Sequence, residues 1–425
     1  MHRKLLIATC LVMACGAGLL AQTAGPAAQA SSPSAQARPQ PTPGIPPVTF
    51  RVDVEYVEVD AIVTDRTGAF VRDLTRDDFQ VFEDGKPQKV ELFSVVDIPV
   101  ERTDRVLPDR PPVEPDVRIN DRFEGRMFVI VLDDYHTHPL RSNLVKRAAR
   151  QFIERHLGAN DLAAVVYTSG RADAGQEFTS NKRLLLEAVD RFMGNKVRSR
   201  ALNRMDEYQR LRQQPRDTPL QRSDITDPDD QIRAHQARTA MDTLRSVATY
   251  MEGVRGRRKA VLYVSEGIDY EMYNVFEARE ASTVLDSVRD AIGAATRANV
   301  AFYTIDPRGL TSMGDDAIEM TGFADDPGLR VGPEAFGDEL RLAQDSLRML
   351  AEQTGGLASV NSNDFAGAFD RVVRDNSTYY VLGYYPANTR RDGRYRSIEV
   401  RVNRPGLEVR ARKGYVAPRA NAEPR

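Results

Sequence analysis

The chain has 425 residues, 41% of them hydrophobic and 28% charged, and its formal net charge is −2. This length exceeds one ordinary domain, so we expect two or three domains. Because basic and acidic residues nearly balance, no net positive charge would recruit nucleic acid or anionic membranes. With no Trp and 7% aromatic residues, the sequence does not indicate stacking platforms for bases or sugars.

The first thirty residues have the pattern of an export signal. A basic start is followed by an apolar stretch at 5–21 and by the cleavage pattern Ala28-Gln29-Ala30. We therefore expect residues 1–30 to be a signal peptide. The protein would then be secreted, or would lie in the periplasm or cell envelope.

Both cysteines, Cys10 and Cys15, fall within this segment, so the mature chain would have no disulfide. An alternative stays open, because Val12-Met13-Ala14-Cys15 resembles a lipoprotein box. In that case Cys15 would carry a lipid anchor. The anchor or the signal segment would be the only link to a membrane.

The next segments alternate between linkers and a β unit. Residues 31–47, rich in Ala, Gln, Ser and Pro, are a predicted disordered linker. Residues 48–97 alternate apolar and polar side chains, and a turn at Asp84-Gly85 indicates a hairpin. Residues 98–122, rich in proline and charge, form a second predicted linker.

Residues 123–377 have the pattern of an α/β domain. Continuous apolar runs alternate with amphipathic helices, which favours a doubly wound, mostly parallel sheet covered on both faces. The main predicted strands are 127–133, 161–168, 259–265 and 300–306. Ligands of such sheets bind beyond the carboxyl ends of the strands, where Asp133 is expected. The polar run 196–231 is predicted to be a solvated insertion; the alternative is a lid or partner-binding loop over the ligand face.

Residues 378–418 return to a β pattern, with three strands joined by turns at Arg391-Asp392-Gly393 and Pro405-Gly406. Three strands alone are marginally stable. We hypothesise that they pair with residues 48–97 into one small β-sandwich, with the α/β domain inserted between the two halves.

Four stretches carry a resemblance to a known family. They are VEYVEVDAIVTDRTGAFVRDLTRDDFQVFEDGKPQKVELFSV, RKAVLYVSEGID, VAFYTIDPRGL and YYVLGYYPANTRRDGRYRSIEVRVNRPGLEVRARKGY. With the α/β pattern, the chain resembles the von Willebrand factor A-related proteins of acidobacteria over nearly all of residues 50–417. The resemblance implies a secreted or envelope protein with a von Willebrand A-like, Rossmann-like core flanked by β segments. It implies no established biochemical activity.

The resemblance also implies a metal-ion-dependent adhesion site, in which hydroxyl and carboxylate oxygens hold Mg²⁺. Asp133 matches its first aspartate, and Thr137 replaces its second serine. Thr239 corresponds to the second-loop threonine, and Glu266 to the third-loop aspartate. Tyr135 stands where the first serine would be, and its phenol is too long for that role. We therefore expect a degenerate site, with Mg²⁺ binding as one hypothesis.

A second hypothesis concerns a different metal. Asp134, His136 and His138 alternate along the chain and could supply ligands for Zn²⁺ in a metal-dependent hydrolase. Distant ligands could come from His156 or His235. The plainer interpretation is an exposed loop, with Pro139 starting the next helix.

Several signatures of catalysis are missing from the sequence. It has no G-x-S-x-G elbow, no phosphate-binding loop, no H-E-x-x-H, and no cysteine beyond residue 15. We therefore expect a non-enzymatic, exported interaction or adhesion module that binds a protein partner. The metal-dependent hydrolase is the main alternative, and a structural envelope component is a third.

Overall fold

The computed structural model describes residues 56–99, 125–171, 174–254, 259–272, 280–311 and 326–419. The predicted signal peptide, the first predicted linker and residues 100–122 of the second lie outside these ranges. The chain divides into two units, and the elements described below belong to the unit Val54–Arg425. None of the helices in the described ranges combines the length and hydrophobicity needed to cross a bilayer.

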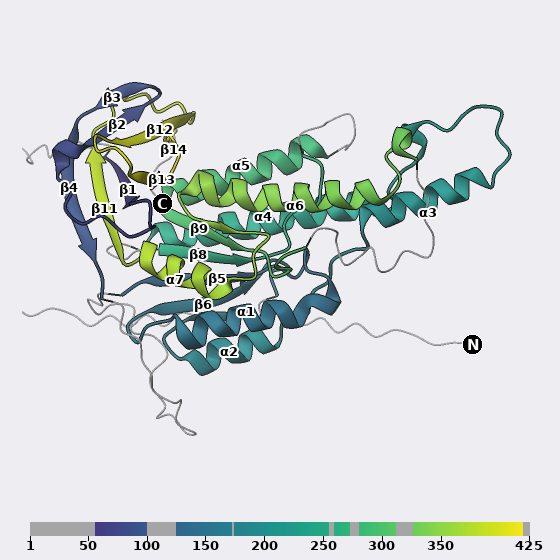
Figure 1. The fold of residues 1–425 in the computed structure, drawn as a ribbon, viewed down its shortest axis with the longest axis horizontal. Coiled ribbons are helices and arrows are strands. Elements are labelled where there is room, and N and C mark those ends of the chain that lie inside the picture. Colours follow the sequence, from purple (N-terminus) through teal and green to yellow (C-terminus); the bar gives the residue numbers. More distant parts are fainter. Residues whose placement is uncertain are drawn as a thin grey trace, which may run out of the picture. The chain divides into compact units, whose positions relative to one another are not determined.

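A six-stranded sheet forms the centre of the α/β domain, in the order β10-β9-β8-β5-β6-β7 (Figure 1). All neighbouring strands are parallel except β7, which pairs antiparallel with β6. The prediction of a mostly parallel α/β sheet is therefore confirmed. The strands are β5 (Met127–Leu132), β6 (Leu162–Tyr167), β7 (Gln176–Thr179), β8 (Lys259–Val264), β9 (Val300–Ile305) and β10 (Ala358–Ser359).

Helices cover both faces of this sheet, because alternate side chains of each buried strand point to opposite sides. Val129 and Val131 of β5 pack with α4, α5 and α6, whereas Phe128 and Ile130 pack with α1, α2 and α7. The first group comprises α4 (Asp230–Glu252), α5 (Ala281–Arg297) and α6 (Pro333–Thr354). The second comprises α1 (Ser142–Arg155), α2 (Lys182–Asp190) and α7 (Phe365–Asp375).

The N- and C-terminal β segments form one sandwich, as hypothesised. In one sheet, ordered β13-β1-β11-β4, the C-terminal strand β11 lies between the N-terminal strands β1 and β4. In the other, ordered β14-β12-β2-β3, β12 pairs with β2. Their bounds are β1 (Val57–Thr64), β2 (Phe79–Glu83), β3 (Lys86–Gln88), β4 (Val90–Asp97), β11 (Thr378–Tyr384), β12 (Tyr395–Val402), β13 (Glu408–Ala411) and β14 (Gly414–Val416).

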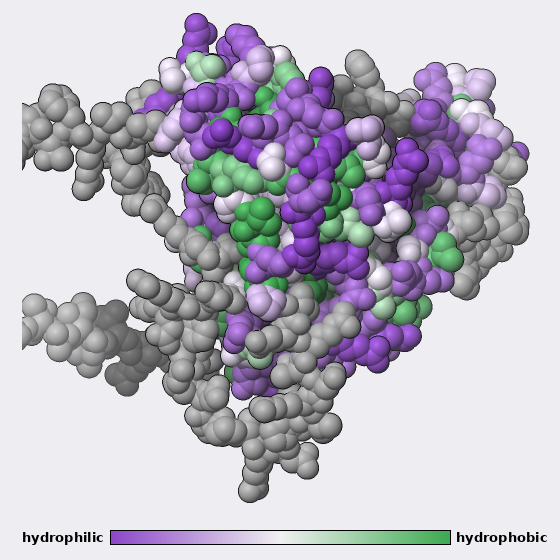
Figure 2. Space-filling view, turned by 60° about the vertical axis from the view of Figure 1, so that its left-hand side comes forward, coloured by the Kyte–Doolittle hydropathy of each residue, from purple (hydrophilic) through white to green (hydrophobic). Residues whose placement is uncertain are grey.

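One predicted C-terminal strand is in fact two, because the chain crosses between the sheets. β13 joins the first sheet and β14 the second, so the last predicted strand is interrupted at Arg412 and Lys413. The two sheets share an apolar core that includes Val59, Tyr380 and Ile398. Figure 2, turned to bring the sandwich side forward, shows apolar residues exposed among polar ones on this side.

The sandwich contacts the amino end of the central sheet. Asn299, which precedes β9, donates a 3.0 Å hydrogen bond to Asp60 of β1. Arg126, which precedes β5, donates a 2.8 Å hydrogen bond to Ser377, next to β11. These contacts leave the opposite, carboxyl end of the sheet to other segments of the chain.

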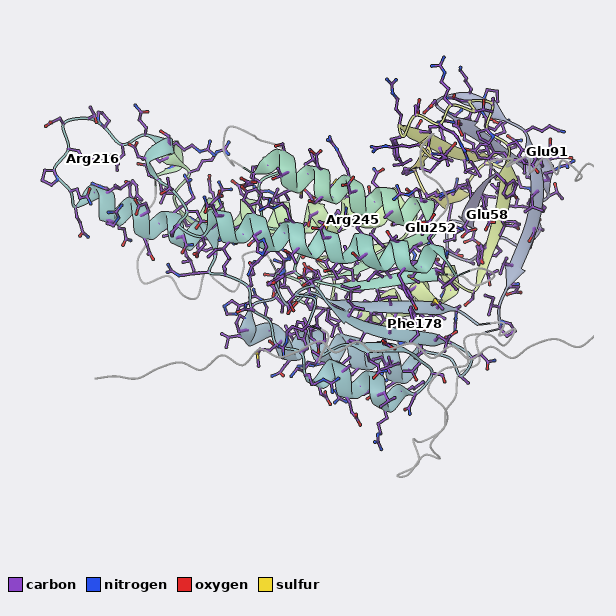
Figure 3. All side chains as sticks on the ribbon, turned by 180° about the vertical axis from the view of Figure 1, so that it is seen from behind. Glu58, Glu91, Phe178, Arg216, Arg245 and Glu252 are labelled. Carbon is purple, nitrogen blue, oxygen red and sulfur yellow. The ribbon has the colours of Figure 1, made fainter. Side chains whose placement is uncertain are left out.

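The polar insertion 196–231 differs from the expected solvated segment. It forms α3 (Arg200–Arg212) and a short 3-10 turn, η3 (Arg222–Asp224). Leu202 and Met205 of α3 are buried in a small core with Phe336 of α6. The expectation was wrong because a few apolar residues, spaced for one helix face, are sufficient to attach α3. Figure 3 labels Arg216, which follows α3 on the part of the insertion distant from the sandwich residues Glu58 and Glu91.

Candidate functional site

The strand order places a topological switch point between β5 and β8, because β6 lies on one side of β5 and β8 on the other. Ligand crevices of doubly wound sheets lie at such points, outside the carboxyl ends of the strands. Asp133 directly follows β5, and Ser265 and Glu266 directly follow β8. The predicted position of Asp133 at a strand end is confirmed.

Asp133 is fully buried and both of its carboxylate oxygens accept hydrogen bonds. Oδ1 accepts from the Thr168 hydroxyl at 2.7 Å and from the His136 backbone N–H at 3.1 Å. Oδ2 contacts His136 Nδ1 at 2.9 Å and accepts from the Ser265 hydroxyl at 2.6 Å and from the Tyr263 hydroxyl. The carboxylate is therefore held by donors from the ends of three neighbouring strands.

Asp133 and His136 form a buried ion pair. Burial by itself would raise the pKa of Asp133, but the charge and hydrogen bonds of His136, with those of Ser265 and Tyr263, lower it to about 2. Burial lowers the pKa of His136, yet the carboxylate of Asp133 outweighs this and the pKa is raised. His136 is 1% exposed, so the interpretation of this histidine as part of an exposed loop is wrong. Its Nε2 is buried without a hydrogen-bond partner.

The two predicted threonine ligands make other contacts. Thr137 donates its hydroxyl to the backbone carbonyl of Asp133 at 2.6 Å. Thr239 lies inside α4 and donates to a carbonyl of its own helix at 2.9 Å. The threonine whose hydroxyl contacts the Asp133 carboxylate is Thr168, which the sequence reasoning missed. Its signal was its position immediately after the apolar run of β6.

Glu266 is also buried, and a cation of the protein itself neutralises it. Arg141 Nε donates to Oε1 at 2.6 Å and Nη2 donates to Oε2 at 2.7 Å. The His138 backbone N–H donates to Oε1 at 3.0 Å. Burial would raise the pKa of Glu266, but Arg141, together with the charges of Lys196 and Arg308, lowers it. The predicted third-loop acid is therefore bound by side chains of its own chain.

Lys196 places a second internal cation at this end of the sheet. Its ammonium lies 3.1 Å from Asp269, 3.9 Å from Glu266 and 4.0 Å from Glu339. Its backbone N–H donates to the Thr137 carbonyl at 3.1 Å, which ties the start of the insertion to the loop after β5. Three carboxylates thus surround a tethered ammonium, and no local sequence pattern indicates this contact.

The proposed zinc ligands do not come together. Asp134 accepts from Thr168 and from the Ser169 backbone N–H, each at 2.9 Å. His136 turns to Asp133, whereas His138 Nδ1 accepts from the Leu140 N–H at 3.3 Å. Within the described ranges, no three His, Cys, Asp or Glu side chains form a group that could hold a metal ion. His156 packs against aromatic rings, and His235 is exposed on α4.

His138 caps the turn η2 (Pro139–Arg141), which leads into α1. Pro139 occupies its first position, so the expectation that this proline starts the next helical segment is confirmed, with a 3-10 turn in place of α-helix.

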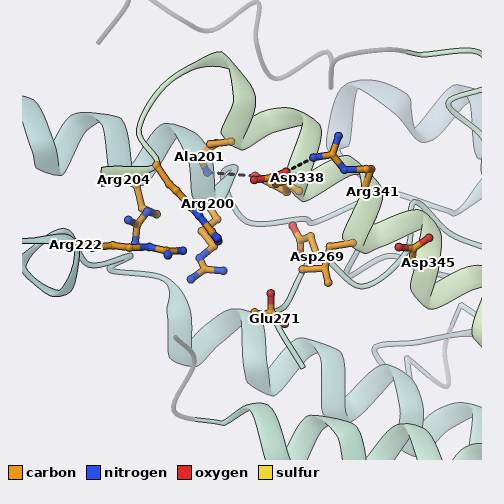
Figure 4. Close-up of a pocket in the computed structure, with 13 residues that line it drawn as sticks. Arg200, Ala201, Arg204, Arg222, Asp269, Glu271, Asp338, Arg341 and Asp345 are labelled. Atoms are coloured by element: carbon orange, nitrogen blue, oxygen red, sulfur yellow. Dashed lines mark hydrogen bonds and ion pairs between the residues drawn. The ribbon is translucent and has the colours of Figure 1, made fainter. Parts of the chain in front are cut away.

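Next to this network is a cavity of about 410 Å³. It lies between α3, η3, the loop after β8 and the first turns of α6. In Figure 4, Arg200, Arg204 and Arg222 lie together on the side formed by α3 and η3, across from Asp269 and Asp345. The lining residues carry five arginines and five acids: Arg200, Arg204, Arg222, Arg330, Arg341, Asp269, Glu271, Asp338, Glu339 and Asp345.

The same end of the sheet exposes large apolar side chains. Leu140 after β5 is 84% exposed, Leu310 after β9 is 64% exposed, and Met193 after α2 is 58% exposed. Loops at this end thus expose apolar side chains to solvent, while the ion pairs beneath them are buried. Such a surface can contact another molecule through apolar area and through the charged cavity.

No protein-family model matches this chain, and no curated protein sequence matches it. What the site can do therefore follows from its own geometry. That geometry combines buried carboxylates that contact cations of the same chain, a cavity lined by arginines and acids, and exposed apolar side chains on the loops.

Proposed function

We propose that this protein is an exported protein-interaction module of the von Willebrand A type. Its recognition surface would be the carboxyl end of the central sheet. The strand order supports this reading of the fold, because it puts Asp133 at the switch point between β5 and β8. The proposal of export rests on the sequence pattern of residues 1–30.

One observation carries the interaction function: cations of the chain itself neutralise the carboxylates at this end of the sheet. Arg141 is bidentate on Glu266, and Lys196 lies within 4.0 Å of Asp269, Glu266 and Glu339. These contacts fix the loops after β5 and β8 to one another. They favour a rigid, degenerate adhesion site. In such a site Arg141 and Lys196, instead of a metal ion, neutralise the predicted ligand Glu266. A rigid surface loses little conformational entropy on binding.

Binding is favoured over catalysis by the state of the acid–base groups. A general base has to reach a proton of the substrate within hydrogen-bond distance. His136 is 1% exposed and its Nδ1 is paired with Asp133, whose own oxygens accept from four side chains. Accessible side chains at this end of the sheet include the apolar Leu140, Leu310 and Met193.

Cross-linking of purified protein to an envelope extract, followed by mass spectrometry, tests the proposal. We compare wild type with the double variant Leu140→Ser, Leu310→Ser. The control is Leu92→Ser, since Leu92 lies on β4 of the sandwich and is 44% exposed. Loss of interface anchors should lower partner recovery by about fivefold or more, whereas the control should behave like wild type. Equal recovery with all three proteins, or cross-links confined to the sandwich, would refute the assignment.

A further inference from the structure

We infer that a second cavity, where the sandwich meets the end of α7, binds a carboxylate group of a peptide. We call it the α7 cavity; its volume is about 470 Å³. It is lined by the turn after β1 (64–68), by the C-terminal part of α7 and by the turn that leads into β13 (406–408). Because α7 ends just before β11 of the sandwich, this site lies apart from the recognition surface proposed above and is additional to it.

Three arginines line the α7 cavity. Arg66 comes from the turn after β1, and Arg371 and Arg374 come from α7. All three side chains are exposed, and within the described ranges none of them pairs with a carboxylate. Arg374 donates from Nη1 to the carbonyl oxygen of Gly68, a neutral acceptor, at 3.4 Å. The three positive charges are therefore available to a ligand.

Other arginines of the sandwich are neutralised by acids close to them. Arg404 lies 2.7 Å from Asp73, and Arg410 pairs with Asp375. Unpaired arginines are thus not a general property of this part of the molecule. Guanidinium groups gathered without a counter-ion attract an anion, and their planar donors match a carboxylate in a bidentate geometry.

The turn after β1 is held in place by its own hydrogen bonds. Asp65 Oδ1 accepts from the Thr67 backbone N–H at 2.8 Å, from the Thr67 hydroxyl at 2.6 Å and from the Ala69 N–H at 3.0 Å. Arg66 lies against the neighbouring turn, because a Cβ added to Gly406 would be 3.5 Å from Arg66 Nε. These contacts position Arg66 at the cavity before a ligand binds, which lowers the entropic cost of binding.

The charge balance favours a singly charged ligand. Besides the three arginines, the cavity is lined by the acids Asp65 and Glu408, so its formal charge is +1. Hydrogen bonds from Thr67 and Ala69 lower the pKa of Asp65, so this acid keeps its charge. One carboxylate brings the cavity to neutrality, whereas a doubly charged phosphate would exceed the available positive charge.

The cavity also favours a peptide over an acidic saccharide. None of the described residues that line it has an aromatic ring on which a sugar could stack. Its volume lies within the range of ligand sites and suits one acidic group with its flanking backbone. The carboxylate can belong to an acidic side chain or to a chain terminus.

The test uses the full purified protein and octapeptide pools immobilised through their acetylated, linker-bearing N-termini. One position is fixed as Glu, Gln or phosphoserine, and the other positions are randomised among uncharged residues. The C-termini are amidated, except in a second Gln pool that keeps its free carboxylate. We expect a pool with one carboxylate to retain more wild-type protein than the amidated Gln pool or the phosphoserine pool. Retention on the Glu pool identifies a side chain as the source, and retention on the free Gln pool identifies a chain terminus.

Variants then assign binding to the α7 cavity. For a peptide selected from the best pool, Arg66→Gln and Arg371→Gln should each raise the Kd about tenfold in low salt. Glu408→Gln should lower the Kd, because it leaves three arginines against one acid. Since Arg66 and Arg371 pair with no carboxylate in the described ranges, neither substitution should lower the melting temperature.

The matched control is Arg401→Gln. Arg401 is an exposed arginine on β12 of the sandwich, pairs with Glu399 at 2.7 Å and does not line the α7 cavity. This variant should bind the peptide like wild type, and so should Leu140→Ser, Leu310→Ser, which alters the other surface.

Three results would overturn the inference: equal retention on all pools, strongest retention on phosphoserine, or equal Kd values for the cavity variants and Arg401→Gln. Vesicles of phosphatidylglycerol provide a further probe, since a phosphodiester also carries one charge. Binding of wild type to these vesicles that Arg66→Gln abolishes, without retention on either carboxylate pool, would assign the α7 cavity to a lipid headgroup instead.

Discussion

Arg141 and Glu266 are joined by two hydrogen bonds, of 2.6 and 2.7 Å, in the buried region beyond the strand ends. Arg141 ends the turn after β5, and Glu266 belongs to the loop after β8. The pair therefore locks together the two loops that flank the topological switch point. Neither residue can be removed alone without leaving a buried charge.

The first prediction concerns this pair. Arg141→Met should lower the free energy of unfolding by about 3–5 kcal/mol, because Glu266 is left as a buried carboxylate without its main partner. Adding Glu266→Gln should recover much of the loss, since Gln is neutral and can still accept from the His138 N–H. Urea denaturation measures both values.

The control for this prediction is the surface pair Arg150–Asp190, whose side chains are 39% and 49% exposed. Arg150→Met should cost less than about 1 kcal/mol. If Arg141→Met and Arg150→Met lower the free energy of unfolding by similar amounts, the buried pair does not hold the two loops together.

The second prediction is a pH dependence with two limbs. The pKa of Asp133 is lowered from 3.8 to about 2, so its stabilisation, about 2 kcal/mol, is present above pH 4 and is lost as the pH falls toward 2. The pKa of His136 is raised above 6.5, so its contribution is complete below pH 6.5 and is lost as the pH rises through the folded-state value. Stability from this pair should therefore be greatest between about pH 4 and 6.5.

His136→Gln tests this assignment in urea titrations from pH 3 to 9. The variant should lose the alkaline limb, and its acid limb should begin at higher pH because Asp133 loses its cationic partner. His235→Gln, at an exposed position on α4, should keep both limbs. If His136→Gln still loses stability at alkaline pH as wild type does, the alkaline limb belongs to another titrating group.

The third prediction concerns Gly267, directly after Glu266. Its φ is +85°, and an added Cβ would lie 2.1 Å from the carbonyl oxygen of Ala343 on α6. Gly267→Ala should therefore cost about 3 kcal/mol or more, through left-handed strain together with displacement of a helix backbone.

Gly68→Ala separates these two contributions. Gly68 has a φ of +81° and nothing within 4 Å of an added Cβ, so only the conformational cost of about 1–2 kcal/mol should appear. Thermal unfolding compares the two variants. If the two variants lose equal stability, the backbone of α6 near Gly267 adjusts to the added Cβ without a cost in free energy.

The fourth prediction concerns metal ions. Lys196→Ala leaves Asp269, Glu266 and Glu339 around a vacated cation position, which should destabilise the fold. Millimolar Ca²⁺ should restore part of the lost melting temperature, because oxygen ligands suit this ion. Wild type and Lys196→Arg keep the positive charge, so their melting temperatures should not change with Ca²⁺, Mg²⁺, Zn²⁺ or EDTA. A higher melting temperature of wild type in Mg²⁺ would instead support an intact adhesion-type metal site.

The sequence was sufficient for most strands and helices of the core, although it did not predict β7. Runs such as Met127–Leu132 are uniformly apolar because both faces of a covered parallel strand are buried, so their composition is a local signal. The same signal placed Asp133 at the end of β5. The pairing of the terminal β segments could be hypothesised because three strands alone are marginally stable, but their order in two sheets could not.

The contacts of the candidate site depended on tertiary structure. Lys196 meets Asp269 and Glu339 from separate elements, and Arg141 reaches Glu266 from 125 residues away in the sequence. Local patterns contain no information on such pairs, because each residue by itself has the character of an ordinary polar loop or helix residue. The sequence by itself therefore determined the α/β core and the position of Asp133. Only the tertiary structure decided that His136 is buried, that internal cations neutralise the acids, and that arginines of the insertion line a cavity beside them. The reason is that these features depend on which distant segments the packed core brings to the carboxyl end of the sheet.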